Sequence, residues 1–547
     1  MERFKNGILV ATAILACASA TPSGAWAQGG ADKAAIAAEL PEGAEFTVCN
    51  GSEPLTLDPS RMTSVSEHTI SMALFEGLVT YDPRTARAVP GIARSWAYSE
   101  GGSRITFTLR DASWSDGTPI TAATVVDSWL RTLDPKTGSE YAYLLGMVIR
   151  GADAYSRGRS GEESVGIRAL DARRFQCDLV GPMPYAVDMM AHPVFSVLPM
   201  HAIRKYGDEW FYPERFVGNG PFVLAAWIPE DSIEVVPNER YWDAGAVGLS
   251  RVVYLPIDDQ AKAYGIYERG EADWAHGVPL ARLDEIRLRP DYHVAPQIAT
   301  YYYYFNLSRA PLDDVRVRKA LAMALDMEEL VDTVNKGGQL PAASLVPAMD
   351  GYESVRGAAF DVAGARRLLA QAGFPDGQGF PAISVVYNTL EGHKRIAEWV
   401  QRSWKKNLGI DVTLVTQDWR SFLGTRSDSH DFYIARAGWV GDYLDPNTFL
   451  DMFIIGSGNN DGLYSNKRYD ELLRRAATMK AGPARMDVLR KAETILILED
   501  QAVIPFYYYV EQDLIDLTRW DGWYSNPLGV HNLKFVTRRA AVTKLAN

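Results

Sequence analysis

The sequence is poor in cysteine. Its 547 residues include three, and Cys17 lies in the N-terminal apolar run, so only Cys49 and Cys177 belong to the rest of the chain. Two cysteines in so large a chain do not form a disulfide framework, even in an oxidising compartment. We expect no bridge between them, because Cys49 lies in the first expected strand and Cys177 in a separate inserted region. A disulfide requires Cα atoms within about 7 Å.

Long hydrophobic runs are also lacking. Arg3 and Lys5 precede an apolar run from Ile8 to Ala20, which is too short for a membrane span. The small residues Ala25 and Ala27, on either side of Trp26, follow this run. This pattern predicts a secretory signal peptide over residues 1–27. The alternative is a lipoprotein box with an acylated Cys17, although Leu15 is unusual in such a box. No later segment is long and apolar enough to span a bilayer, so we expect an exported, soluble protein.

Positive charge is not in excess. Lys and Arg number 56 against 68 Asp and Glu, a formal net charge of −12, and no basic block interrupts the sequence. This balance argues against binding to nucleic acid or to anionic membrane surfaces. The eight histidines show no metal-ligand spacing, and no glycine-rich loop for phosphate is present. We therefore expect neither a metal nor a cofactor.

Catalytic motifs are equally sparse. Ser403 to Lys406 fits Ser-x-x-Lys, and Lys136-Thr137-Gly138 fits Lys-Thr-Gly, the signatures of penicillin-recognising hydrolases. Their order is reversed, the Ser-Asp-Asn element is missing, and Ser403 lies within an expected amphipathic helix. No spacing singles out a glycosidase carboxylate pair. The sequence therefore predicts no catalytic residue.

What the chain has is length, aromatic residues and alternating elements. Its length allows two or three domain-sized cores, and its 14 Trp and 27 Tyr can serve cores or ligand clefts. In the first half, patterns predict strands over 46–49 and around 105–109 and helices over 66–78 and 121–133. In the second half they predict helices over 314–334, 361–372 and 393–408 and a strand over 411–415, which indicates an α/β lobe. Two aromatic strands, 301–305 and 506–510, bracket this lobe, and we interpret them as crossovers between two lobes.

The stretch from Asp431 to Pro446 carries the most chemistry. Phe432 to Ala435 reads as a buried strand with Arg436 at its end, followed by a glycine-punctuated turn from Gly438 to Asp442. Arg436 offers a planar set of donors suited to a carboxylate, and Asp442 offers an acceptor suited to an ammonium. A peptide carries both groups. The alternative is that Arg436 and Asp442 pair with each other or with solvent.

Motifs in colinear order give the chain a family resemblance. An alternating strand is followed by Arg-Asp, Trp-Ser-Asp-Gly and a helix within 93–133, and further pieces match at 75–78, 218–221, 241–243, 314–318, 404–409 and 436–439. This order resembles the large solute-binding proteins of bacterial ABC importers, in particular the oligopeptide-binding branch. The resemblance implies an α/β, two-lobed periplasmic binding protein fold (type II-like) with the ligand between the lobes. It implies lobe I from residues 28–76, 200–298 and 509–547, an inserted subdomain at 77–199, and lobe II at 299–508.

The resemblance also implies a set of site residues. Asp442 would hold the peptide ammonium, the backbone of Gly438 and Val440 would pair with the peptide as an added strand, and Trp439 and Trp419 would line side-chain pockets unless they are plain core. Arg426, Arg436 and His393 would meet the carboxylate of peptides of different length, unless His393 is an exposed helix cap. Val65 and Tyr141 complete the candidate set.

Several positions depart from the family pattern. Tyr304 and Asn335, with Lys336 adjacent, stand where some relatives have an acidic residue and a lysine in the cleft, and Thr63 replaces another acidic residue. Ala299 and Val440 stand where some relatives carry cysteines. Ligand preference is therefore expected to differ from those relatives.

The function that the resemblance implies is transport without catalysis. We expect a monomeric periplasmic protein that binds small peptides and delivers them to the transmembrane subunits of an ABC permease. The alternatives are another solute (a murein peptide, an opine, a glycoside or a nickel chelate) and, from a different class, a secreted hydrolase.

Overall fold

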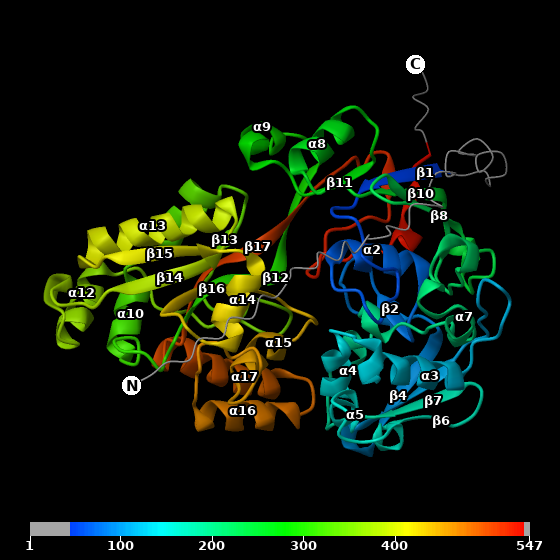
Figure 1. Ribbon diagram of the computed structural model, residues 1–547, viewed down its shortest axis with the longest axis horizontal. Coiled ribbons are helices and arrows are strands. Elements are labelled where there is room, and N and C mark those ends of the chain that lie inside the picture. The colour runs from blue at the N-terminus through cyan, green and yellow to red at the C-terminus, as the bar shows by residue number, and fades with distance from the viewer. Residues whose placement is uncertain (1–43, 541–547) are drawn as a thin grey trace, which may run out of the picture. The chain divides into compact units, whose positions relative to one another are not determined.

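The computed structural model describes residues 44–540 (Figure 1). The expected signal peptide, its cleavage site at Ala27 and the alternative acylation site at Cys17 lie outside the described residues. Between residues 44 and 540, no helix combines the length and apolarity that crossing a bilayer requires.

One mixed sheet of eleven strands runs through the described chain. Two long antiparallel strands, β12 (Tyr292–Phe305) and β17 (Val503–Ile515), lie at its centre and connect its two halves (Figure 1). On the β17 side follow β11 (Trp274–His276), β1 (Ala44–Cys49), β10 (Leu249–Leu255), β9 (Ser232–Pro237) and β8 (Phe222–Ile228). On the β12 side follow β16 (Ile434–Val440), β14 (Ile383–Asn388) and β15 (Val412–Gln417), and β13 (Leu340–Pro341) pairs with β17.

The two aromatic segments interpreted as crossovers are parts of β12 and β17, so the expected two-lobed fold with two crossovers is confirmed. The lobe boundaries that we propose, at residues 298/299 and 508/509, fall inside these strands. Alternate tyrosines of β12 face opposite cores, as period-two geometry requires. Tyr301 and Tyr303 belong to one core cluster, and Tyr302 and Tyr304 belong to another.

Helices cover both faces of the β14–β16 half of the sheet. One face carries α10 (Val315–Met323), α11 (Met327–Leu330), α12 (Val362–Gln371) and α13 (Glu391–Leu408); the other carries α14 (Trp419–Leu423), α15 (Asn447–Leu450), α16 (Lys467–Ala477) and α17 (Pro483–Thr494). The helices expected over 361–372 and 393–408 are confirmed. The single helix expected over 314–334 is wrong, because the Asp326 side chain accepts from the amides of Glu328 and Glu329 and starts a separate helix there.

The region that we propose as an inserted subdomain has its own sheet. Its strand order is β4 (Ala93–Ser99), β5 (Arg104–Leu109), β7 (Arg174–Asp178) and β6 (Ile167–Ala169), beside the short pair β2 (Val79–Tyr81) and β3 (Ala88–Pro90). Helix α3 (Ala122–Leu133) is capped by Thr121, as expected, and buries Trp129 completely. Helices α4 (Ala142–Val148), α5 (Ala152–Ser156) and α6 (Ala186–Met189) pack nearby, and α7 (Met200–Tyr206) follows.

Helix α2 (Val65–Leu74) ends earlier than the expected residue 78, because Phe75 is extended and donates its amide to Ser71. The rest of the first lobe carries α8 (Gln260–Glu268), α9 (Leu283–Ile286) and the small pair β18 (Trp520–Asp521) and β19 (Thr537–Arg538). Cys49 in β1 and Cys177 in β7 are buried and free, so the expected absence of a bridge between them is confirmed.

Candidate functional site

Strand β16 organises the site. The expected turn from Gly438 to Asp442 is wrong in its first half, because β16 continues through Val440 and pairs with β12 along its whole length. Arg436 is therefore a mid-strand residue and does not end the strand. On the opposite edge, β14 pairs only with Ile434 and Ala435. The edge from Arg436 to Val440 has no strand partner among residues 44–540, so alternate backbone groups there are open to an extended ligand.

Arg436 lies among neutral polar and aromatic groups. Its guanidinium is 4.9 Å from the centre of the Tyr301 ring and donates to the Tyr509 hydroxyl at 3.1 Å and to Asn388 Oδ1 at 3.4 Å. Its buried Nε has no hydrogen-bond partner, and no carboxylate within the described residues pairs with it. A guanidinium with free donors and no counter-ion is a suitable site for a carboxylate.

His393 lies beside Arg436, in the first turn of α13. The alternative of an exposed helix cap is wrong, since the side chain is buried and its ring is 5.5 Å from that of Tyr301. Burial, with a smaller contribution from the Arg436 charge, lowers the pKa of His393 to about 3. The imidazole is therefore neutral and can offer a hydrogen bond but no charge.

Asp442 follows β16 and is half-buried. Its amide donates to Thr448 Oγ1 at 3.1 Å, and within the described part of the chain its carboxylate has neither Arg436 nor any other cation as a partner. Burial raises the pKa of Asp442 to about 7. A carboxylate in this state gains most from an arriving cation, because the cation offsets the cost of desolvation.

A cavity of about 350 Å³ opens at Asp442. It contains a second carboxylate, Asp451, which accepts from Asn447 Nδ2 at 3.0 Å and from the Tyr443 hydroxyl at 3.3 Å. Burial, and then the charge of Asp442, raises the pKa of Asp451 to about 8. Asp451 was missed in the sequence analysis, because it reaches the cavity only through the fold of residues 443–446 and of α15, which precede it in the chain. The lining is completed by Tyr143, Met147, Trp439, Tyr443, Thr448 and residues 454–457 and 459.

The remaining candidates are distributed around these two centres. Trp439 is half-buried in the Asp442 cavity, and Tyr141 stacks on His192 at 5.2 Å, close enough to Asp442 that, after burial, its charge raises the pKa of Tyr141. Trp419 on α14 is not core, with 54% of its surface exposed. Val440 and Val65 are exposed as well, and Gly438 is half-buried against the Tyr509 hydroxyl.

Arg426 is already engaged. Its Nε is 2.7 Å from a carboxylate oxygen of the buried Asp461, so a ligand carboxylate would have to compete with an internal one. Tyr304 is buried and donates to the Asn459 carbonyl at 2.8 Å, and the Thr63 amide donates to Glu67. Ala299 and Val440 are cross-strand partners, so the two positions where some relatives carry cysteines face each other.

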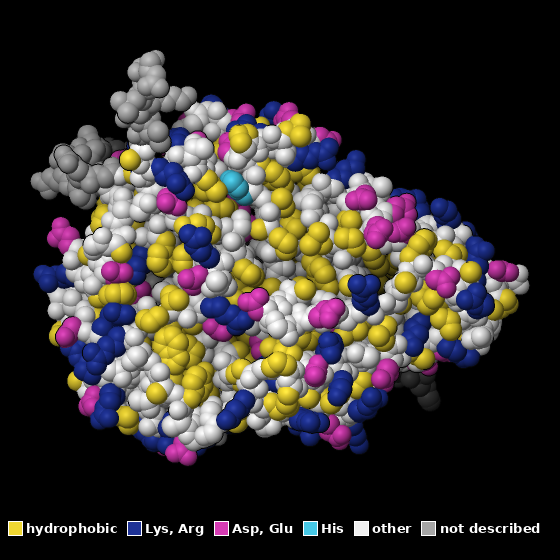
Figure 2. All heavy atoms as spheres, turned by 180° about the vertical axis from the view of Figure 1, so that it is seen from behind, with side chains coloured by type: hydrophobic (Ala, Val, Ile, Leu, Met, Phe, Trp, Pro, Cys, Tyr) yellow, Lys and Arg dark blue, Asp and Glu magenta, His cyan; other side chains and the backbone are white. Residues whose placement is uncertain are grey.

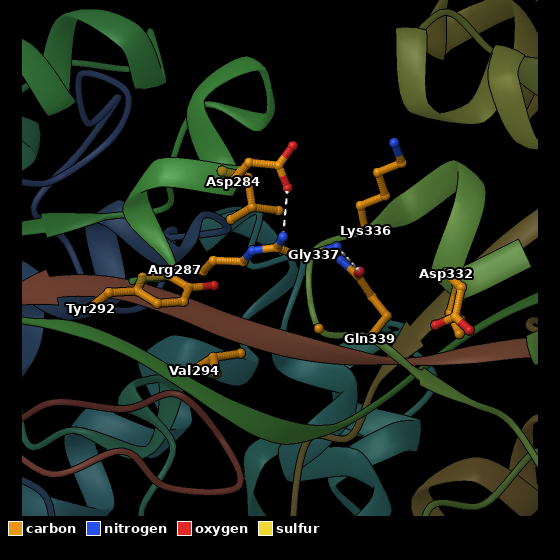
Figure 3. Close-up of a pocket in the computed structure, with 11 residues that line it drawn as sticks. Asp284, Arg287, Tyr292, Val294, Asp332, Lys336, Gly337 and Gln339 are labelled. Carbon is orange, nitrogen blue, oxygen red and sulfur yellow. Dashed lines mark hydrogen bonds and ion pairs between the residues drawn. The ribbon is translucent and has the colours of Figure 1, made fainter. Parts of the chain in front are cut away.

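A larger cavity, of about 660 Å³, lies between α9 and the segment after α11 (Figure 3). In it Arg287 is directed to Asp284, with which it forms an ion pair of 3.1 Å, and Lys336 points away from Tyr292 (Figure 3). Neither Arg436 nor Asp442 lines this cavity. Its charges are also largely satisfied or exposed, so the smaller cavity at Asp442 is the better candidate.

The face shown in Figure 2 and the remaining motifs were the next candidates for a site. Figure 2 shows basic and acidic side chains interspersed over one face, without a large patch of one sign. The Ser-x-x-Lys match lies on α13, whereas Lys136 and Thr137 form a short turn, Pro135–Thr137, after α3. The two matches thus belong to different regions of the fold.

The 77–199 region contacts the loop that follows Asp442. Tyr185 from this region stacks on Tyr443 with ring centres 4.8 Å apart, and Asn447 Nδ2 donates to the Tyr185 hydroxyl at 3.3 Å. Arg87 donates to the Leu444 carbonyl at 3.2 Å. The buried ion pair of Arg485 with Asp445 (2.5 Å) holds this loop in place. The Asp442 cavity therefore has residues of both regions in its lining.

Comparison with known proteins shows the family of the chain. Residues 87–461 match the family model of the bacterial extracellular solute-binding proteins, family 5. The chain is 36% identical over 521 residues to the periplasmic oligopeptide-binding protein OppA of Salmonella typhimurium, covering 92% of this chain and 95% of that protein. It is 35% identical over 488 residues to a probable deoxycholate-binding periplasmic protein of Escherichia coli, YgiS, covering 87% and 89% of the two chains.

Among solved structures, Haemophilus influenzae OppA in complex with RPPGFSPFR superposes with a TM-score of 0.76 at 30% identity, covering 91% of this chain and 100% of that chain. The family model alone spans well over half of the chain. The protein belongs to family 5 of the bacterial extracellular solute-binding proteins.

Proposed function

We propose that the protein binds oligopeptides between its two lobes and delivers them to an ABC-type peptide permease for import. The observation that carries this proposal is a pair of opposite charges, Arg436 and Asp442, that lie beside one open strand edge and have no counter-ion among residues 44–540. Asp442 would take the ammonium, Arg436 the carboxylate, and the backbone of β16 the amides between them. Main-chain pairing of this kind recognises the backbone of a peptide and is independent of its side chains.

The spacing supports a short ligand. At about 3.3 Å per residue, the open edge from Arg436 to Val440 spans about 13 Å, which is the length of about four extended residues. His393 would add a neutral hydrogen bond beside Arg436. Because Arg426 is paired with Asp461, we propose Arg436 as the principal carboxylate site and Arg426 as a subsidiary one for longer ligands.

The charge of the cavity distinguishes peptides from other solutes. A bile acid such as deoxycholate is an anion with no ammonium, so it would leave Asp442 without a cation. A zwitterionic peptide satisfies both ends of the site. We therefore place the deoxycholate-type ligand second.

The proposed cellular location and partners follow from the family. We propose that residues 1–27 are removed on export, that the protein works in the periplasm as a monomer, and that its macromolecular partner is the transmembrane part of the permease. The proposed activity is binding, with no turnover of the ligand.

The decisive experiment is calorimetric titration with trialanine and with N-acetyl-trialanine. Removing one partner of a buried charge pair typically costs about 3–5 kcal/mol. Asp442→Asn should therefore weaken trialanine binding by about a hundredfold to a few thousandfold. Acetylation should weaken binding to the wild type by a similar factor, and the two losses should not add, because both remove the same interaction.

Asp431→Asn is the matched control, since Asp431 is an exposed aspartate that pairs with Arg309 outside the site. It should bind trialanine like the wild type. If acetylated and free trialanine bind the wild type equally well, Asp442 does not hold an ammonium and the peptide proposal fails with it.

A further inference from the structure

A second group of unsatisfied acids lies away from Asp442, where the crossover strand β17 meets β11. His276 of β11 and Asp513 of β17 are direct cross-strand partners, and Glu511 lies two residues along β17 on the same face. His276 Nδ1 is 3.0 Å from Asp513 Oδ1 and 3.9 Å from Glu511 Oε1. One ligand atom from each of the three side chains lies within 4.8 Å of the others.

Two oxygens of this group have no protein partner. The side chains of Glu511 and Asp513 are each 1% exposed, yet Glu511 Oε2 and Asp513 Oδ2 lack a hydrogen bond to any described residue. Buried carboxylate oxygens are normally satisfied, because desolvation without a partner is costly. Their position beside the His276 imidazole is that of a ligand set for a cation.

A second histidine contacts the cluster through Glu511. His531 Nε2 is 2.9 Å from Glu511 Oε1, and its side chain is 4% exposed. The Trp523 ring stacks on His531 at 4.6 Å, and the Trp274 indole donates to Asp513 Oδ1 at 2.8 Å. These contacts hold Glu511 and Asp513 in place in advance, as supporting contacts do in metal sites.

We propose that His276, Glu511 and Asp513 bind a divalent transition-metal ion of the zinc type. One imidazole and two carboxylates are a donor set that suits Zn²⁺ and its neighbours better than Mg²⁺ or Ca²⁺, which prefer oxygen ligands alone.

The charge of the cluster suits a divalent ion, because two buried carboxylates, Glu511 and Asp513, lie together in it. His276 is 46% exposed and offers the route of entry.

The site joins two strands. His276 belongs to β11, and Glu511 and Asp513 belong to the crossover β17. A bound ion would fasten the end of the crossover to the first lobe. We therefore expect it to raise the melting temperature of the protein and to leave trialanine affinity within about twofold, because none of its ligands lines the Asp442 cavity.

The test uses the full mature chain, stripped with EDTA and dialysed against micromolar Zn²⁺ with metal analysis of the protein. We expect one Zn²⁺ per chain, and Co²⁺ in its place should give the visible absorption of a four-coordinate nitrogen and oxygen site. The Glu511→Gln/Asp513→Asn double variant should bind Zn²⁺ at least tenfold more weakly. Its folding is checked by trialanine titration, and His276→Gln supplies a single-residue variant with the same expected direction.

The matched control is His201→Asn. His201 forms an exposed pair with Asp116, 2.8 Å apart, outside the cluster. This variant should keep one Zn²⁺ per chain. The proposal is overturned if the wild type binds no stoichiometric Zn²⁺, or if loss of His201 removes the ion while the cluster variants retain it.

Discussion

At the scale of single residues, the candidate site is defined by two charges that have no counter-ion within residues 44–540. Asp442 and Arg436 are both half-buried, and the guanidinium contacts only neutral polar and aromatic groups. The contrast with Arg485 and Asp445 is instructive, because that fully buried pair lies close by and is bidentate. The fold can therefore pair charges in this region, and the two open ones are available to a ligand.

The first prediction concerns the proton on Asp442. Because burial raises its pKa to about 7, the carboxyl is mostly protonated at pH 6 and must ionise to hold an ammonium. Trialanine binding should therefore release close to one proton at pH 6, and affinity should fall, by up to about tenfold per pH unit, below pH 7. Calorimetry in two buffers of different ionisation enthalpy measures the release.

Asp442→Asn is the control for this pH dependence. It should bind weakly with an affinity that falls less steeply between pH 7.5 and 5.5, since one of the two titrating carboxyls of the cavity is gone and Asp451 remains. An affinity of the wild type that stays constant over that range would contradict the assignment of the proton to Asp442.

At the scale of elements, the sequence predicts that a strand exists at β16, whereas pairing with β12 determines how far this strand extends. The apolar run at 432–435 predicted a strand, but Gly438 and Gly441 indicated a turn that begins at once. Pairing with the long strand β12 overrides that local preference and carries β16 through Val440. Sequence and resemblance identified the candidate residues. The extension of β16 decides where they lie, with Arg436 on one face of the strand and Asp442 in the cavity beyond its end.

The second prediction concerns Gly438, whose backbone φ is not positive and needs no glycine. A Cβ there would lie 3.0 Å from the Tyr509 hydroxyl and 3.2 Å from Arg436 Nη2. Gly438→Ala should therefore displace the Arg436 guanidinium and weaken trialanine binding about tenfold, or about 1.4 kcal/mol. Thermal stability should not fall, since alanine is favoured over glycine within a strand.

Gly245→Ala is the matched control, because a Cβ at Gly245 meets no atom within 4 Å. It should leave binding unchanged. Amidating the C-terminus of trialanine should weaken binding to the wild type and have little further effect on Gly438→Ala. Equal losses from amidation in both proteins would show that Gly438 acts independently of the carboxylate end.

At the scale of the whole molecule, the sequence was sufficient to predict the overall fold. It was insufficient to predict the sites formed by residues that are distant along the chain. Colinear motifs and two aromatic strands predicted the two-lobed fold with its crossovers. Asp451 and the His276 cluster were not predicted, because their members come together only through cross-strand register and the folding back of later segments. No spacing rule connects residue 276 with 511 and 513.

The last prediction concerns the contact between the 77–199 region and the loop that follows Asp442. Tyr185 stacks on Tyr443 and accepts from Asn447 across the interface. An aromatic pair contributes about 0.5–1.5 kcal/mol beyond its buried area. Tyr185→Ala should therefore reduce the fraction of molecules in which the two regions are in contact, and weaken trialanine binding by about two- to tenfold. Small-angle scattering should show a larger radius of gyration without ligand. Tyr212→Ala, which removes a stack on Trp227 within one lobe, should change neither quantity. Unaltered scattering and affinity in Tyr185→Ala would mean that the Tyr185–Tyr443 stack does not hold the two regions in contact.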